Sequence, residues 1–226
     1  GGAREQSPLR PKHVEKKPPC SHTCPSGNSI RGFITTIAQA EKKGKTPDQA
    51  LEEAWYIYTN TSPFPSVCGR VCPAPCETGC NRKEVDDPVS INKIERSIGD
   101  FGIANNLPLR ILTEEKKNKK VAVVGGGPGG VSCAYQLARR GYGVKIFEAM
   151  DKAGGMLRYG VPSYRLPDPA LDKDIEHIRA IGVEMHFNHR VGRDSTFAEL
   201  LDKFDALFVS TGLDVPSNMR IEGEDH

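Results

Sequence analysis

Residues 121–130, VAVVGGGPGG, decide the fold of this chain. Four apolar residues precede the pattern Gly125-x-Gly127-x-x-Gly130, and a helical pattern follows to about residue 140. Between a strand and a helix, the first glycine permits a tight turn, the second lets the backbone approach a pyrophosphate, and the third allows close packing of helix on strand. The phosphates then rest on free N–H groups at the helix N-terminus. The stretch predicts a dinucleotide-binding loop made by Gly125, Gly127, Pro128, Gly129 and Gly130.

Strands and helices alternate after this loop. We expect strands at 121–125, 143–148, 183–187 and 206–211, and helices at 129–140, 169–181 and 196–203. Such a series builds a parallel sheet covered by helices. Glu148 ends the second strand, where an acidic side chain can accept hydrogen bonds from ribose hydroxyls. The pattern itself does not distinguish FAD from NAD(P).

The region before the loop holds six of the seven cysteines. Two prolines interrupt the second group of them, and an interior proline removes a helical hydrogen bond and clashes with the preceding turn. We therefore expect an irregular loop with converging sulfurs there, rather than one helix. The first group is Cys20 and Cys24, and the second, in CGRVCPAPCETGC, is Cys68, Cys72, Cys76 and Cys80.

Three helices are expected around these cysteines. The first runs from about Asn28 to Lys43, the second starts at a capping box of Thr46 and Gln49, and the third starts after Ser90. If the first two helices pair as an antiparallel hairpin, the two groups of thiols can meet in space.

Clustered thiols with no secretory signal before them point to metal or cluster ligands rather than to disulfides. Thiolates are the usual ligands of iron–sulfur clusters. Structural zinc is the alternative, although zinc sites favour Cys-x2-Cys pairs, which three successive four-residue intervals fit poorly. Cys133 follows the glycine loop on a helix, where we expect a small core residue rather than a ligand.

Glu95 is a further candidate ligand. It lies on the apolar stripe of the third helix, together with Ile91 and Ile98. A carboxylate on a buried face costs free energy unless it is paired or bound to a metal. The alternative is that Glu95 marks the edge of the stripe or pairs with a nearby arginine.

Composition argues against some partners. The net charge is +2 with 27% charged residues, which gives no electrostatic basis for binding nucleic acid or an anionic membrane. The longest apolar runs are far shorter than a membrane span. We expect a cytoplasmic protein without membrane insertion.

Together these motifs resemble one family: the small (beta) subunit of NADPH-dependent glutamate synthase and its relatives. Those relatives include the N-terminal part of dihydropyrimidine dehydrogenase and the large subunit of NADH-dependent ferredoxin:NADP oxidoreductase. The resemblance rests on PPCSHTCPSGNSIRGFI, CGRVCPAPCETGCNR, VAVVGGGPGG, FEAMDKAGGMLRYGVPSYRLP and ALFVSTG. It implies a helical domain with [4Fe–4S] clusters and then a Rossmann-like domain, with FAD as the occupant of the glycine loop.

The resemblance also implies particular site residues. Cys24, Cys72 and Cys76 match three ligands of one cluster, and Glu95 matches the fourth, which is a Glu or Gln in relatives. The residues that the resemblance places beside FAD are Gly154, Gly155, Met156, Leu157, Thr211 and Gly212.

The sequence departs from the family pattern in two ways. Relatives with two clusters carry a Cys-x2-Cys pair upstream of Cys20, where this chain reads VEKKPP. Cys20 and Cys80 match ligands of that second cluster, so it is either absent or held by an altered set that includes Cys68. The chain also ends before a second glycine pattern for NAD(P)H and before the C-terminal flavin segment, so we expect a fragment, or a partner that supplies the rest.

The expected fold class is an α-helical iron–sulfur domain followed by an incomplete α/β Rossmann-like FAD domain. The expected segments are a flexible arm at 1–19, the helical [4Fe–4S] domain at 20–112, a charged linker at 113–120 and the N-terminal part of the FAD domain at 121–226.

The expected function is electron transfer. NAD(P)H would reduce FAD, which passes single electrons to the cluster and to a partner oxidoreductase subunit or a ferredoxin-like acceptor. One alternative is a non-catalytic relay that docks on an enzyme with its own nicotinamide site. A second is an NAD-dependent dehydrogenase with a zinc-binding N-terminal domain.

Overall fold

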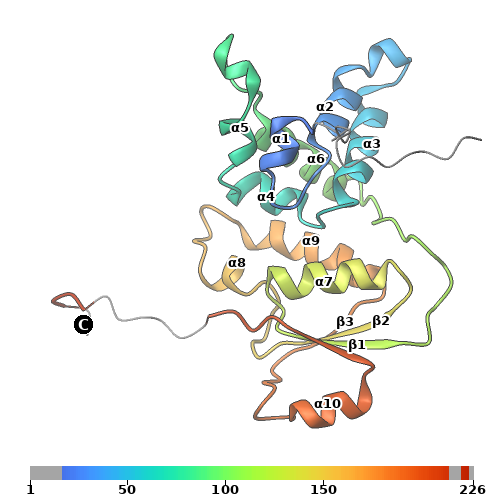
Figure 1. Ribbon diagram of the computed structural model, residues 1–226, viewed down its shortest axis with the longest axis vertical. Helices are drawn as coiled ribbons and strands as arrows, with labels where there is room; N and C mark the ends of the chain where they lie inside the picture. The colour runs from blue at the N-terminus through green and yellow to red at the C-terminus, as the bar shows by residue number, and fades with distance from the viewer. Residues whose placement is uncertain (1–16, 214–219, 224–226) are drawn as a thin grey trace, which may run out of the picture.

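The computed structural model describes residues 17–213 and 220–223. Helices build the first part of the chain, and an α/β unit builds the second (Figure 1). Most of the predicted arm at 1–19 lies outside the described residues. The elements of the helical part are α1 (Pro19–Thr23), α2 (Ile30–Ala38), η1 (Glu41–Lys43), α3 (Pro47–Thr59), α4 (Pro65–Val71), α5 (Pro75–Thr78), η2 (Asn81–Glu84) and α6 (Ile91–Ala104).

The α/β part is a four-stranded parallel sheet in the order β3-β2-β1-β4. Its helices α7 and α9 lie between the sheet and the helical part, and α10 lies on the opposite face (Figure 1). The predicted parallel sheet is therefore confirmed. Its elements are β1 (Lys120–Val124), α7 (Pro128–Ala138), β2 (Gly143–Phe147), α8 (Met156–Tyr159), α9 (Asp168–Ala180), β3 (Glu184–His186), α10 (Phe197–Lys203) and β4 (Ala206–Val209).

Alternating side chains of the strands fill two cores. Val123 and Ile146 belong to the large core with α7 and α9, whereas Ala122 and Phe147 belong to a small core with Leu200 of α10. This division follows from the two-residue repeat of a strand, which sends neighbouring side chains to opposite faces.

The large core continues across the boundary between the two parts. Trp55 and Ile98 of the helical part belong to the same buried cluster as Tyr135 of α7 and Ile178 of α9. All four are at most 1% exposed. The two parts are therefore held together by buried apolar side chains as well as by the connecting chain.

Helices α4 and α6 touch backbone to backbone at two glycines. A Cβ added to Gly69 would lie 2.4 Å from Cα of Arg96, and one added to Gly99 would lie 2.3 Å from the backbone nitrogen of Ser66. Real Cβ atoms do not approach other atoms so closely. The spacing of α4 and α6 therefore depends on the missing side chains at these two positions.

The predicted capping box at the start of α3 is confirmed. Gln49 N–H donates to Thr46 Oγ1 at 3.2 Å, and Thr46 N–H donates to Gln49 Oε1 at 3.0 Å. The single helix expected at 28–43 is wrong in its extent, because α2 ends at Ala38 and a separate 3₁₀ turn follows. A short 3₁₀ turn after an α-helix is a common way to end it.

The expectation of an irregular loop at 68–80 is also wrong. Cys68 lies on α4, and Cys76 lies on α5, which starts at Pro75. A proline at the first helical position loses nothing, because its missing N–H would have no partner inside the helix. The prolines thus prevent one continuous helix over 68–80, but they are compatible with two short helices.

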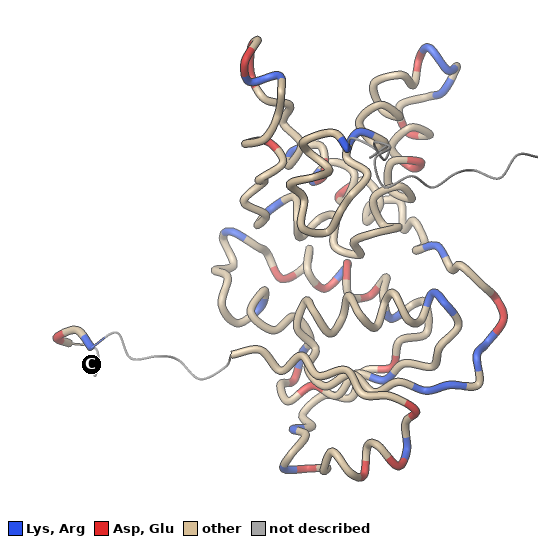
Figure 2. The backbone as a smooth tube through the Cα atoms, in the orientation of Figure 1, with Lys and Arg blue, Asp and Glu red and all other residues tan. Residues whose placement is uncertain are grey.

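Figure 2 shows both signs of charge scattered along both parts of the chain. Among the described residues, no helix combines the length and the apolar character that crossing a bilayer requires.

Candidate cluster and dinucleotide sites

Two of the predicted thiol ligands leave the ends of short helices in the same way. Cys24 follows α1 and donates its backbone N–H to the Cys20 carbonyl at 3.2 Å. Cys72 follows α4 and donates its N–H to the Cys68 carbonyl at 3.0 Å. Both residues have extended backbone, so each ends its helix.

Cys76 and Glu95 complete a group of four acidic side chains with Cys24 and Cys72. Each of these two side chains is 5% exposed. Burial raises the pKa of Cys76 to about 12, and the charges of Glu95, Cys72 and Cys24 add to the rise. Burial also raises the pKa of Cys72; a hydrogen bond from the Ala74 N–H lowers it, and the charges of Glu95 and Cys24 raise it further. Cys72 and Cys76 therefore both lie within electrostatic range of Glu95 and Cys24.

Glu95 has no basic partner in the described part of the chain. It makes no ion pair with Lys or Arg and no hydrogen bond there, so the predicted alternative of an arginine pair is not seen. Burial, together with the charge of Glu77, raises the pKa of Glu95 to about 7. A buried carboxylate surrounded by acidic groups and lacking a cation is costly, and a bound positive centre would offset that cost.

This donor set fits an iron–sulfur cluster. Thiolates are its standard ligands, and these ligands surround several irons rather than meeting at one point. Among residues 17–213 and 220–223, no three His, Cys, Asp or Glu side chains converge as closely as one bare metal ion requires. The fit therefore rests on the chemistry of the donors and their lack of a counter-charge.

Cys68 lies beside this group in a pocket of hydroxyls. Burial raises the pKa of Cys68 to about 11, although hydrogen bonds from Tyr58 and Ser62 lower it. The charges of Glu95 and Cys72 also act on Cys68. The structure thus brings Cys68 towards the first group of ligands.

Cys80 has different surroundings. Backbone N–H groups of Val89 and Arg82 lower the pKa of the Cys80 thiol. Cys80 follows α5, which packs against α1, the helix that carries Cys20. The predicted second set of Cys20, Cys68 and Cys80 therefore divides between two environments.

The glycine loop joins β1 to α7 as predicted. Gly125 has a φ of +105°, which favours glycine, and a Cβ on Gly130 would lie 1.9 Å from the Gly125 carbonyl oxygen. The space above Gly127 is open, because a Cβ added there would have only one neighbouring atom within 4 Å, the Cα of Gly155 at 3.8 Å. The space above Gly127 is the kind of cradle in which a pyrophosphate rests on a helix N-terminus.

Glu148 is held by the loop itself. Its Oε2 accepts from Gly126 N–H at 2.6 Å, and its Oε1 accepts from Met150 N–H at 2.8 Å. The side chain is 7% exposed. Both oxygens therefore have backbone partners, and the contact with a ribose stays a prediction.

Two other predicted segments converge on the glycine loop. Gly154 N–H donates to the Gly126 carbonyl at 2.8 Å, and a Cβ on Gly155 would lie 2.8 Å from Cα of Gly127. On the other side, Thr211 lies next to Gly125, whose added Cβ would be 3.2 Å from its Cα. Met156 and Leu157 start α8, and Gly212 has a φ of +72°.

Arg158, which was not predicted from the sequence, holds α8 in place. The Arg158 guanidinium is buried, and its Nε donates to the Ala153 carbonyl at 2.8 Å. Its Nη1 lies 3.3 Å from Asp168 Oδ1, and Nη2 pairs with Asp172. The two aspartates four residues apart on α9 were the signal that could have found it.

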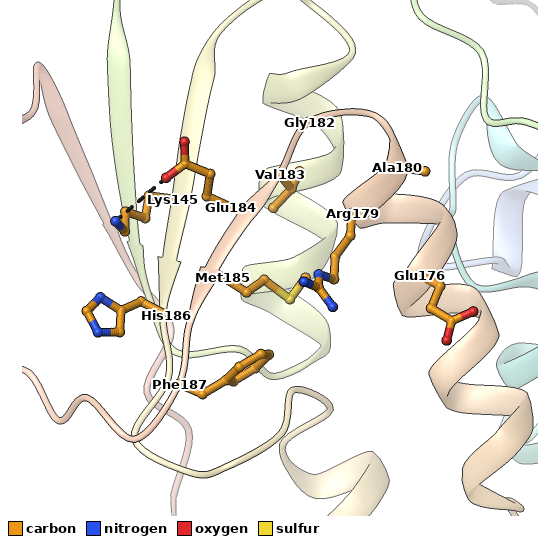
Figure 3. Close-up of a pocket in the computed structure, with 10 residues that line it drawn as sticks. All are labelled: Lys145, Glu176, Arg179, Ala180, Gly182, Val183, Glu184, Met185, His186 and Phe187. Carbon is orange, nitrogen blue, oxygen red and sulfur yellow. Dashed lines mark ion pairs between the residues drawn. The ribbon is translucent and has the colours of Figure 1, made fainter.

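An open hollow lies beside β3, and its lining includes Glu176 and Arg179 of α9 together with the ion pair of Lys145 and Glu184 (Figure 3). Neither the cysteines nor the glycine loop line it. We assign no role to this hollow.

Comparison with known proteins finds a family match for each of the two parts of the chain. Residues 14–107 match the family described as dihydropyrimidine dehydrogenase domain II, 4Fe-4S cluster, and residues 123–204 match the NAD(P)-binding Rossmann-like domain. The chain belongs to the family of the glutamate synthase small chain and dihydropyrimidine dehydrogenase domain II. Relatives in this family are named as subunits of an oxidoreductase, a formate dehydrogenase and a glutamate synthase.

Three relatives illustrate the family. The NADPH-Fe(3+) oxidoreductase subunit beta of Geobacter sulfurreducens is 41% identical over 209 residues, which cover 92% of this chain and 30% of that protein. The NADP(+)-dependent formate dehydrogenase subunit beta of Moorella thermoacetica is 39% identical over 92% of this chain and 31% of its own length. The glutamate synthase [NADPH] small chain of Bacillus subtilis is 39% identical over 77% of this chain and 35% of its own length. The chain thus spans about a third of each relative.

Proposed function

We propose that this chain carries the flavin and cluster sites of an NAD(P)H-dependent oxidoreductase. FAD would lie on the glycine loop, and one [4Fe–4S] cluster would be held by Cys24, Cys72, Cys76 and Glu95. When bound, the flavin can accept a hydride and release single electrons, and the cluster can carry one electron at a time. The observation that carries the proposal is the group of Cys24, Cys72, Cys76 and Glu95, in which Cys76 and Glu95 are buried and Glu95 pairs with no basic side chain among the described residues.

The residues of the chain have distinct tasks in this proposal. The thiols of Cys24 and Cys72 leave the ends of α1 and α4, and α6 presents Glu95 from another direction. A carboxylate in place of a fourth thiolate changes the ligand set, which is one of the levers on a cluster's reduction potential. On the other side of the interface, Gly127 leaves room for phosphates and Glu148 orders the loop that receives them.

The wider reaction rests on the relatives. Two of them are named for NADPH or NADP(+) and are beta subunits, which supports NAD(P)H as the electron donor and a partner oxidoreductase subunit or ferredoxin-like protein as the acceptor. Because the chain spans about a third of these proteins, the nicotinamide site is assigned to the whole protein rather than to the residues described.

The test is cofactor analysis of protein purified without oxygen. We expect iron and acid-labile sulfide in the ratio of one [4Fe–4S] cluster per chain, with FAD, and an EPR signal from one reduced cluster. Addition of NADH or NADPH to the full-length protein should bleach the flavin absorbance. Zinc without acid-labile sulfide would contradict the proposal.

The same experiment separates the relay alternative. A protein that contains FAD and the cluster, but is reduced only when a partner enzyme is added, would be a relay without its own nicotinamide site. A protein that binds nicotinamide and no flavin would be a dehydrogenase instead.

A further inference from the structure

Helix α4, which carries Cys68 and ends at Cys72, lacks a cap of its own. Its N-cap residue is Phe64, whose side chain accepts no hydrogen bond, and the first helical residues Pro65, Ser66 and Val67 are buried. The first N–H groups of a helix have no partner inside it. Buried N–H groups without partners are costly, so another part of the chain must supply an acceptor.

That acceptor comes from the dinucleotide-binding part. Asp174 of α9 is fully buried, and its Oδ2 accepts from Val67 N–H at 3.1 Å. The two residues are 107 positions apart in the chain. A carboxyl oxygen at this place accepts the hydrogen bond that an N-cap side chain would accept, but it reaches the helix from across the interface.

The capped helix is tied firmly to the helix that bears Glu95. Arg70 of α4 makes two hydrogen bonds to Asp100 of α6, at 2.7 and 3.0 Å, and Ser66 Oγ donates to the same carboxylate at 2.7 Å. The close glycine contacts between α4 and α6 add to this. A displacement of α4 would therefore carry candidate ligands of the cluster with it.

The same helix α9 also holds the segment beside the glycine loop. Asp168 and Asp172 bind Arg158, whose Nε contacts the carbonyl next to Gly154. One helix of 13 residues thus contacts the capped cysteine helix through Asp174 and the candidate flavin segment through two other aspartates.

A second contact joins the dinucleotide-binding part to the helical part near the start of α4. Arg139, which follows α7, is 1% exposed, and its guanidinium donates to the carbonyl and side-chain oxygen of Asn60, at 2.8 and 3.0 Å. Asn60 ends α3, just before α4. A cation therefore meets the C-terminal end of α3, and a carboxyl group meets the start of α4.

We propose that Asp174 is a positioning residue that fixes the cysteine-bearing helix α4 relative to the glycine-loop site. One part of the proposal rests on the proposed function, namely that the position of α4 sets the rate at which electrons pass between the flavin and the cluster. The cap itself is independent of that function.

The first test is hydrogen exchange at the Val67 amide in the cofactor-loaded protein. Loss of a cap typically costs about 1 kcal/mol, so Asp174→Ala should speed this exchange by about fivefold or more. Asp174→Asn keeps an acceptor oxygen of the same reach and should restore slow exchange. Glu176→Gln changes an exposed carboxylate of the same helix, which pairs with Lys173, and should have no effect.

The second test is the rate at which NAD(P)H reduces the cluster in the full-length protein. Asp174→Ala should slow this reduction while the iron content stays that of the wild type, and Asp174→Asn should restore the rate. Unchanged exchange in Asp174→Ala would overturn the cap. If Asp174→Ala showed faster exchange at Val67 but an unchanged rate of cluster reduction, Asp174 would have only a structural role. That result would overturn the proposed positioning role.

Failure of the proposed function gives a different result. A wild-type protein whose cluster is not reduced by NAD(P)H would contradict the proposed electron transfer before any variant is made. The exchange data would still decide whether Asp174 caps α4.

Discussion

The cysteine site and the glycine loop bury carboxylates in opposite ways. Glu148 accepts two backbone hydrogen bonds, one from Gly126 of the glycine loop and one from Met150, so both of its carboxylate oxygens have protein donors. Glu95 has no such donors among residues 17–213 and 220–223, and burial raises its pKa to about 7. The loop of the dinucleotide site is therefore ordered by its own hydrogen bonds, whereas the buried carboxylate of the cysteine site needs a bound positive centre to offset its charge.

The largest expected effect is at the cysteine site. Cys72→Ser should abolish the visible absorbance of the cluster and nearly all of its iron and sulfide, because one of the proposed ligands is lost. It should also lower the unfolding temperature of the loaded protein, since binding to the folded state stabilises that state. Iron analysis, absorbance and a thermal melt measure these effects.

Cys133→Ser is the matched control. Cys133 lies on α7, away from the proposed ligands, and it should keep the full iron content. If Cys72→Ser also retained all its iron, the proposed ligand set would be wrong.

A smaller effect is expected from a methyl group in the glycine loop. Gly127→Ala places its Cβ in open space, so the protein should fold with nearly unchanged stability. The methyl group should nevertheless weaken FAD binding by about tenfold or more, which corresponds to about 1.4 kcal/mol, because it fills the phosphate cradle. Titration with FAD measures the affinity, and the iron content should not change.

Gly130→Ala is the comparison variant, because its added methyl group should lower the stability of the fold and not only FAD binding. Its Cβ would lie 1.9 Å from the Gly125 carbonyl oxygen, so the variant should lose about 1–3 kcal/mol of stability through overpacking. Equal FAD affinity in Gly127→Ala and the wild type would place the cofactor elsewhere.

The smallest effect concerns pH and the interface between the two regions. His177 of α9 packs edge-on against Trp55 of α3, with ring centroids 5.5 Å apart, and neither ring nitrogen has a hydrogen-bond partner in the part of the chain that the structure describes. Burial lowers the pKa of His177, as does Lys173, while Glu176 raises it. The unfolded chain therefore takes up a proton more readily than the folded chain. As a result, the free energy of unfolding of the protein decreases as the pH falls through about 6.5.

His177→Phe should remove this dependence, because the ring remains but cannot be protonated. Chemical unfolding of both proteins between pH 5.5 and about 8 would measure it. Parallel stability curves for the two proteins would show that His177 does not titrate on unfolding.

Local signals of the sequence predicted much of this fold. The glycine pattern, the capping box of Thr46 and the alternating strands each depend on residues close in the chain, and the structure confirms the elements that they indicate. The buried position of Glu95 on the apolar stripe of α6 could also be read from helical spacing. The domain boundaries and the individual site residues stay predictions.

Long-range contacts could not be read in this way. Nothing near Val67 indicates that Asp174 caps it, because the pairing depends on how α9 packs against α4. The two short helices of the cysteine region were missed for a different reason. A proline either breaks a helix or begins one, and the choice depends on where the preceding turn ends.

The glycine contacts between α4 and α6 have a genetic consequence. Every single-base missense change in a glycine codon adds a Cβ, and at Gly69 or Gly99 that atom would strike the neighbouring backbone. A mutation at either position would push α6, with Glu95, away from the helix that ends at Cys72. Mutations that damage the proposed cluster site are therefore expected at more positions than its ligands. Two of these positions are glycines, which have no side chain.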